Sequence, residues 1–225
     1  MRKQNKHYPR ELKAVFEKIE HQVFLLHDRW IIYRQLYGTS KERIELLNES
    51  APNYFWIIQD VLWDEILLDI CRLADPIQSG RDKKSKKNLC LEMLCQIIKE
   101  LGREDLYSDI CNSLSRFREK CEGLKKHRNK RIGHLDLRVF LNEKSKYLPG
   151  ISRAMIEDVL KELRFFMNSI NGFYRDSETA YELCIMTGDG EFLINALKQA
   201  LRYEELWRAG KIGIMDLQNT KHYKS

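Results

Sequence analysis

Residues 10–37 read RELKAVFEKIEHQVFLLHDRWIIYRQLY, and this stretch decides the fold class. It contains neither Gly nor Pro, and its apolar side chains recur at alternating spacings of four and three residues. The members of this stripe are Leu12, Phe16, Ile19, Val23, Leu26, Trp30, Tyr33 and Tyr37. Such spacing puts the side chains on one face of an α-helix. The stretch therefore predicts one long amphipathic helix, up to about 42 Å at 1.5 Å per residue.

Helical patterns continue along the rest of the chain. Thr39 and Glu42 have the spacing of a capping box and predict the start of a short helix, and Pro52 is expected to begin a third. Further helices are expected at roughly 88–101, from about 104, at 152–174 and at 190–208. Strand-like alternation is absent from the sequence. We therefore predict an all-α, up-and-down helical bundle over residues 1–175, with a C-terminal helical extension and tail over 176–225.

Composition narrows the class of protein further. The chain has 225 residues, is 43% hydrophobic, and carries 39 Lys or Arg against 33 Asp or Glu. A chain of this length buries roughly 70% of its unfolded surface, so it needs neither disulfides nor a structural metal to fold. The charged beginning, MRKQNKHYPREL, and the lack of about 18 uncharged apolar residues in a row favour a cytoplasmic protein without a membrane segment. Six cysteines without a CxxC pair are expected to be buried free thiols.

Positive charge is concentrated in two stretches. Residues 116–138 hold nine Lys or Arg against three acids, so this stretch alone accounts for the net charge of +6. A second basic cluster lies at residues 81–87. Localised positive fields suit a polyphosphate partner such as RNA, because Lys and Arg that neutralise phosphates release condensed counterions. A solvated loop and a solvated helix face are the alternative interpretation.

The segment KKHRNKRIGH, residues 125–134, combines helix pattern, charge and reactive groups. Arg128 and Arg131 fall where the apolar stripe of the preceding helix predicts apolar side chains. An inward guanidinium is costly unless it meets an acid or lines a groove open to an anion. Gly133 is expected to end the helix and to leave His134 just beyond it. Cations that favour a helix C-terminus are the alternative explanation of this pattern.

Cleavage of an RNA phosphodiester is the reaction that these groups suit. Attack by the 2′-OH needs a base to take its proton and an acid for the leaving 5′-oxygen, and a His with a pKa near 6.5 can do either. Arg supplies a permanent charge to the transition state without a metal. One His cannot easily be both base and acid. A two-fold dimer that joins two copies of the segment would supply both.

RNKRIGH, residues 128–134, resembles the signature of the HEPN superfamily: an Arg, a polar neighbour, four to six intervening positions and a His near a helix end. Other segments resemble the AbiU-type branch, which is associated with phage abortive infection. These are RWIIYRQLYG (29–38), ERIELLNESAP (42–52), LWDEILLDICRLADP (62–76), HRNKRIGHLDL (127–137) and PGIS (149–152). The resemblance covers roughly residues 10–172.

The resemblance implies a metal-independent endoribonuclease, a toxin or antiviral effector that acts as a homodimer and leaves 2′,3′-cyclic phosphate ends. It assigns catalysis to Arg128 and His134, with Asn129 as the polar neighbour, and it implies no metal or other cofactor. RNA contacts are expected from the basic residues Lys125, Lys126, Lys130 and Arg131. A nucleotidyltransferase-type antitoxin partner is common among such proteins. A non-catalytic HEPN module that binds RNA or a nucleotide, or senses a partner, is the alternative function, and a purely structural bundle is a third.

Carboxylates lie one turn apart on the helix that begins at Pro52, as with Glu65 and Asp69. Such pairs can serve metal binding or acid–base chemistry, but a solvated helix face or pairing with Arg72 explains them as well. Asp69, Arg72 and Asp75 are also placed to orient the basic segment.

Overall fold

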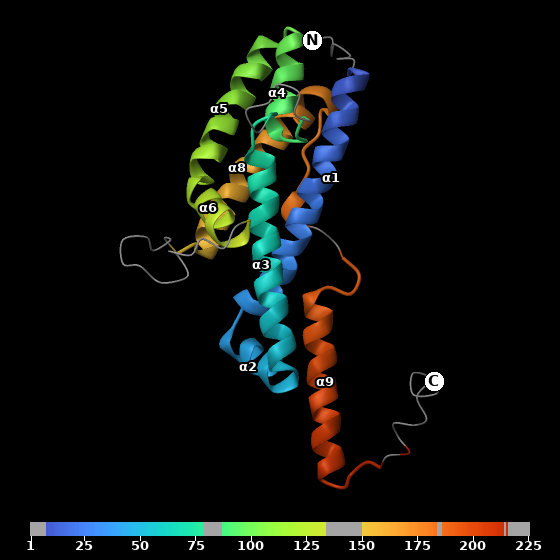
Figure 1. The fold of residues 1–225 in the computed structure, drawn as a ribbon. Helices are drawn as coiled ribbons and strands as arrows, with labels where there is room; N and C mark the ends of the chain where they lie inside the picture. Colours follow the sequence, from blue (N-terminus) through green and yellow to red (C-terminus); the bar gives the residue numbers. More distant parts are fainter. Residues whose placement is uncertain (1–7, 79–86, 134–149, 184–185, 214, 216–225) are drawn as a thin grey trace. The chain divides into compact units, whose positions relative to one another are not determined.

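The computed structural model describes residues 8–78, 87–133, 150–183, 186–213 and 215 (Figure 1). All regular secondary structure in these residues is helical, which confirms the predicted all-α fold. The helices are α1 (Arg10–Tyr33), α2 (Lys41–Ser50), α3 (Pro52–Ala74), α4 (Leu91–Glu100), α5 (Glu104–Lys120), α6 (Glu122–His127), α8 (Arg153–Arg175) and α9 (Gly190–Arg208). Two π-helical turns, η1 (Arg34–Gly38) and η2 (Arg128–Ile132), and a 3₁₀ turn, η3 (Tyr181–Leu183), follow α1, α6 and α8. Within the described ranges, no helix combines the length and the apolar character that crossing a membrane requires.

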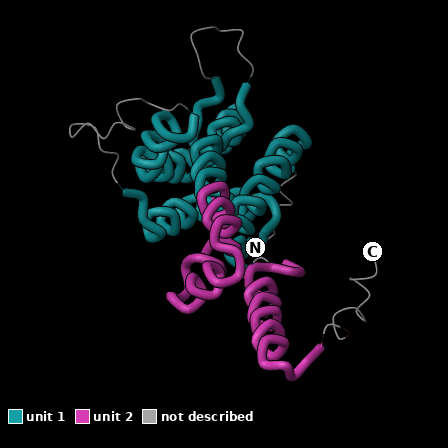
Figure 2. The backbone as a smooth tube through the Cα atoms, turned by 60° about the horizontal axis from the view of Figure 1, so that its bottom comes forward, with its two compact units in different colours: residues 1–29, 63–184 teal, residues 30–62, 185–225 magenta. Residues whose placement is uncertain are grey.

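The chain divides into two compact units (Figure 2). Unit 1 comprises residues 1–29 and 63–184, and unit 2 comprises residues 30–62 and 185–225. Both α1 and α3 contribute to each unit. These units differ from a simple division of the chain after residue 175, because residues 30–62 group with residues 185–225. That residues 1–175 form a domain of their own stays a prediction.

The core of unit 1 comes from apolar stripes at helical spacing. The predicted stripe of α1 is fully buried at Leu12, Phe16, Ile19, Val23 and Leu26. The predicted stripe of α8 is fully buried at Ile156, Val159, Leu163, Met167 and Ile170. Each such side chain contributes about 1.5–3 kcal/mol when it leaves water. Because α5 packs along α8, these stripes hold the basic end of α5 in a helical bundle.

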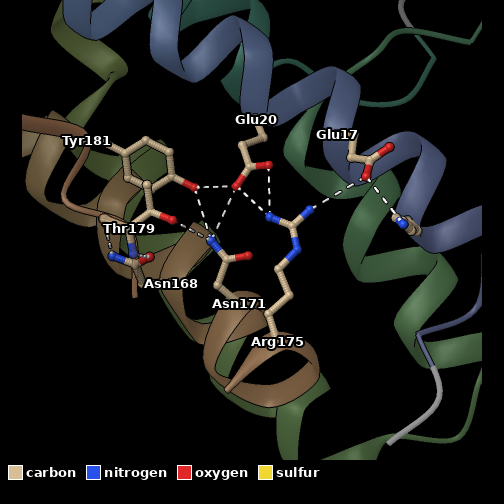
Figure 3. Close-up of polar contacts among 8 residues, drawn as sticks. Glu17, Glu20, Asn168, Asn171, Arg175, Thr179 and Tyr181 are labelled. Atoms are coloured by element: carbon tan, nitrogen blue, oxygen red, sulfur yellow. Dashed lines mark hydrogen bonds and ion pairs between the residues drawn. The ribbon is translucent and has the colours of Figure 1, made fainter. Parts of the chain in front are cut away.

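A polar network joins α1, α8 and η3 inside unit 1 (Figure 3). Arg175 Nη1 donates to both carboxylate oxygens of Glu20, each at 3.0 Å. The same carboxylate accepts from Asn171 Nδ2 at 3.4 Å and from the Tyr181 hydroxyl at 3.2 Å. The Arg175 guanidinium also lies 4.9 Å from the centre of the Phe16 ring. Only 13% of the Glu20 side chain is exposed, so its charge depends on these partners.

His27 is a buried histidine of the same unit. Its Nδ1–H donates to the Val23 carbonyl at 2.8 Å, and its Nε2 lies 3.4 Å from Arg164 Nη1 as an acceptor. Burial lowers the pKa of His27 below its ordinary value, because the charged ring would lose its hydration. The ring is therefore neutral at pH 7. His21, also on α1, is exposed.

Unit 2 has a small core of its own, formed by Leu36, Leu47, Phe55 and Ile194. Arg43 of α2 donates to both oxygens of Glu191 at the start of α9, at 2.5 and 2.9 Å. This bidentate pair joins two helices that are distant in the sequence.

The cap of α2 differs from the sequence prediction. Ser40, and not Thr39, is the N-cap residue, and its side chain accepts from the Arg43 amide at 3.4 Å. The Thr39 hydroxyl instead donates to the Arg34 carbonyl at 3.0 Å. The capping box at Thr39 was wrong because η1 widens the end of α1 and supplies this carbonyl as a competing partner. Glu42 still lies near the cap, where the Ser40 hydroxyl lowers its pKa.

Candidate functional site

The basic segment lies at the end of a helix that is interrupted twice. One continuous helix was expected from residue 104, but α5 ends at Lys120, and α6 starts after Cys121. The π-helical turn η2 then carries residues 128–132. The Gly133 amide closes this turn by donating to the Arg128 carbonyl at 2.6 Å. A Cβ on Gly133 would lie 3.2 Å from that oxygen, so the close approach favours glycine.

Arg128 is partly buried and held by two neighbours. Its Nη1 donates to Asp75 Oδ2 at 2.7 Å, and its Nε donates to Asn129 Oδ1 at 3.0 Å. The side chains of Arg128 and Asp75 are 22% and 24% exposed. This confirms that an inward arginine at this position meets an acid. A guanidinium has five N–H donors, so within the described residues three remain to bind an anion.

Arg131 does not share this environment. It was expected on the inward stripe with Arg128, but its side chain is exposed. The expectation was wrong because it assumed a constant α-helical repeat. The wider π-helical turn η2 changes the direction in which each following side chain leaves the backbone.

Asp75 is positioned by Arg118, a residue that the sequence analysis missed. Arg118 Nε donates to the Ala74 carbonyl at 3.0 Å, and its Nη2 donates to the Asp75 carbonyl at 3.3 Å. Arg118 also pairs with Glu92 at 3.2 Å, and this hydrogen bonding lowers the pKa of Glu92. Arg118 thereby caps the C-terminal carbonyls of α3. No local signal could have found it, since 44 positions separate it from Ala74.

The other acids of α3 are engaged in ion pairs. Arg72 Nη1 donates to Glu65 at 3.0 Å and to Asp69 at 3.1 Å, and Arg29 donates to the second oxygen of Asp69 at 2.5 Å. Burial raises the pKa of Asp69, while both arginines oppose that shift. The pairing of these acids with Arg72 is confirmed. In the described ranges, no group of three or more His, Cys, Asp or Glu side chains is arranged to hold a metal ion.

The remaining predicted RNA contacts lie on the same end of the helix. Lys125 is partly buried and lies 3.6 Å from Glu122, Lys126 is exposed, and Lys130 is partly exposed on η2. His134, the second predicted catalytic residue, lies outside the described residues. So does the second basic cluster, except Lys87.

The buried thiols of Cys71 and Cys121 are protonated at neutral pH. Burial raises the pKa of Cys71 to about 11, although the charge of Arg128 opposes this shift. Burial likewise raises the pKa of Cys121 to about 12. A neutral buried thiol is a poor nucleophile, so neither cysteine is expected to act as one.

Comparison with protein-family models found a match over residues 10–193 to the HEPN family described as AbiU2. The match spans most of the chain and includes Asp75, Arg128, Asn129 and His134. The comparison with curated proteins found no match, and the comparison with solved structures found none either.

Proposed function

Because the chain belongs to the AbiU2 family of HEPN proteins, we propose that it is a metal-independent endoribonuclease that acts as a toxin or phage-defence effector. The observation that carries this proposal is the guanidinium of Arg128, which Asp75 and Asn129 hold in place at the basic end of the bundle. Preorganised charge of this kind stabilises a transition state without reorganisation during the reaction.

Arg128 binds the scissile phosphate in the proposed reaction. Its charge is permanent, and the fork of N–H donors matches two phosphate oxygens at once. In Arg128, Nη1 donates to Asp75 and Nε donates to Asn129, so Nη2 is the nitrogen that we expect to bind the phosphate. The phosphate thereby meets a guanidinium of fixed orientation.

His134 performs the proton transfers. The 2′-oxygen attacks phosphorus, its proton passes to one imidazole, and the leaving 5′-oxygen takes a proton from a second imidazole. The products are a 2′,3′-cyclic phosphate and a 5′-hydroxyl. Since one chain carries one His134, two copies form the complete site, and a two-fold axis brings them together.

Flanking phosphates bind to Lys125, Lys126, Lys130 and Arg131. Each neutralised phosphate of a single strand adds about 0.7 to the negative slope of log affinity against log salt. The affinity for RNA is therefore expected to fall steeply with salt, and alanine at Lys126, which is exposed, lowers the slope by about that amount.

Cleavage of a mixed RNA pool in excess EDTA tests the proposal. The wild type is compared with Arg128→Ala and His134→Ala, and with Arg202→Ala as a control that removes an exposed arginine of α9. The wild type and the control produce cyclic-phosphate ends, and Arg128→Ala loses about 10²–10³-fold in rate. Cleavage that persists in both site variants excludes this assignment. RNA binding without cleavage by the wild type favours a non-catalytic HEPN module instead.

The homodimer is tested separately, by light scattering at micromolar concentration. A dimer is the expected result, and a strict monomer contradicts the two-histidine site. We propose that a nucleotidyltransferase-type antitoxin inhibits the ribonuclease. Co-purification of the chain with the product of a neighbouring gene of that class tests this proposal.

A further inference from the structure

A cavity of about 300 Å³ opens beside Asp75 in unit 1. It is lined by Gln22 of α1, by Asp69, Arg72, Leu73 and Asp75 at the end of α3, and by Asn88 and Leu89 before α4. Its volume lies at the lower end of the range of about 300–1,000 Å³ that is usual for small-molecule sites. The cavity therefore has room for one small planar group.

The lining combines two apolar side chains with hydrogen-bonding groups. Leu73 is buried and Leu89 is 43% exposed, so both present apolar surface to an occupant. Gln22 carries an amide, which offers a donor and an acceptor. Asn88 Nδ2 donates to the Pro76 carbonyl at 2.9 Å, and Arg72 Nη1 donates to Glu65 and Asp69, so both side chains are held in place at the cavity wall. Unpaired nucleobases are recognised by stacking on aromatic or guanidinium planes and by hydrogen bonds to their edges, and here the guanidinium of Arg72 supplies such a plane.

The charges of the lining favour a base over a phosphate. Asp69 is already paired with Arg29 and Arg72, and Asp75 is paired with Arg128, so the charges of the cavity wall largely compensate one another and leave no excess of positive charge to attract a phosphate. Carboxylates accept hydrogen bonds from amino groups of bases but repel phosphate oxygens. In the proposed function the phosphate binds to the basic segment, so the base and the phosphate of a nucleotide would bind to different groups of the protein.

Asp75 connects the cavity with the proposed reaction site. Its carboxylate borders the cavity and also accepts from Arg128 Nη1 at 2.7 Å. Only the side chain of Asp75 therefore separates the cavity from a phosphate bound to Arg128. We infer that the cavity binds the base of the nucleotide next to the scissile phosphate and gives the cleavage a base preference. This inference rests on the proposed function for the identity of its substrate.

A binding experiment with the full chain tests the cavity without any cleavage. The probes are the four common nucleoside 5′-monophosphates and, as a base-free control, ribose 5-phosphate, measured by ligand-observed NMR. We expect at least one nucleotide to bind about tenfold or more tightly than ribose 5-phosphate. Equal affinities for all five probes, or no nucleotide binding, overturn the inference.

Two tryptophan substitutions on α1 locate the binding. Gln22→Trp fills the mouth of the cavity, whereas His21→Trp adds the same bulk at an exposed neighbour that does not line it. Both positions are exposed, so both variants are expected to unfold at the wild-type temperature. Gln22→Trp lowers nucleotide affinity about tenfold or more, and His21→Trp leaves it unchanged. Unchanged nucleotide affinity in Gln22→Trp overturns the inference.

Sequencing of the cleavage products separates this inference from the proposed function. A base preference next to the cut that disappears in Gln22→Trp and persists in His21→Trp supports both. Cleavage by the wild type with no base preference overturns the inference and leaves the endoribonuclease proposal standing. Nucleotide binding that Gln22→Trp abolishes, in a wild type that cleaves no RNA, supports the cavity as a nucleotide site and removes the proposed reaction.

Discussion

The effect of Asp75→Asn on stability is expected to change sign with the residue at position 128. Asp75 follows the last residue of α3, where a carboxylate meets the negative end of the helix dipole at a cost of about 0.3–1 kcal/mol. The ion pair with Arg128 offsets this cost at a distance of 2.7 Å. Because both side chains are about three-quarters buried, we expect the pair to contribute about 1–2 kcal/mol. This lies between the values for exposed and for buried pairs.

Asp75→Asn in the wild type removes both the favourable pair and the unfavourable dipole contact. The expected result is a decrease of about 0.5–1 kcal/mol in the free energy of unfolding. In the Arg128→Ala background only the unfavourable dipole contact is removed, since the other described cations at this helix end are paired with other acids, Arg118 with Glu92 and Arg72 with Glu65 and Asp69. There Asp75→Asn stabilises the protein by about 0.3–1 kcal/mol.

Urea unfolding of the wild type, both single variants and the double variant measures the coupling. Circular dichroism follows the helices, and linear extrapolation gives each free energy of unfolding. Asp75→Asn in a Lys126→Ala background is the control, since Lys126 is an exposed neighbour without a bond to Asp75 among the described residues. A coupling energy below about 0.3 kcal/mol, or the same sign in both backgrounds, refutes the reasoning.

Three further predictions follow from burial and pairing. Arg175→Ala leaves a buried carboxylate without its bidentate partner and lowers the free energy of unfolding in urea by about 2–3 kcal/mol, whereas Arg202→Ala, in an exposed pair, changes it by less than about 0.5 kcal/mol. Iodoacetamide at pH 8 modifies the partly exposed Cys111 of the native protein before the buried Cys71, because burial raises the pKa of Cys71 to about 11, and equal rates by mass spectrometry contradict this. The pKa of His27 is lowered on folding, so the unfolded chain binds the extra proton, and stability falls as pH drops below about 6.5. His27→Leu is expected to flatten the dependence of urea midpoint on pH between 7 and 5, and an unchanged slope contradicts it.

The helices could be predicted from the sequence because helical periodicity is a local property. The stripes of α1 and α8, from Leu12 to Leu26 and from Ile156 to Ile170, are buried as expected, and the proline at 52 begins α3. The resemblance to the HEPN superfamily was likewise predictable, because it rests on short segments that follow one another along the sequence. Extrapolation failed where the helical repeat changes, at Thr39 after η1 and at Arg131 on η2, since a wide turn alters direction without an obvious sequence mark.

The sequence alone determined that Arg128 needs an acid or an anion, because the desolvation of an inward guanidinium does not depend on the details of the fold. Only the tertiary structure decided that the acid is Asp75, which lies 53 positions away, and that Arg118 holds the end of α3 where this carboxylate is available. The cavity beside Asp75 is likewise a product of packing, since residues from α1, α3 and the approach to α4 border it. Helical periodicity depends on residues that are close along the chain. The ion-pair partner of Arg128 and the cavity beside Asp75 depend instead on how helices that are distant in the sequence pack together.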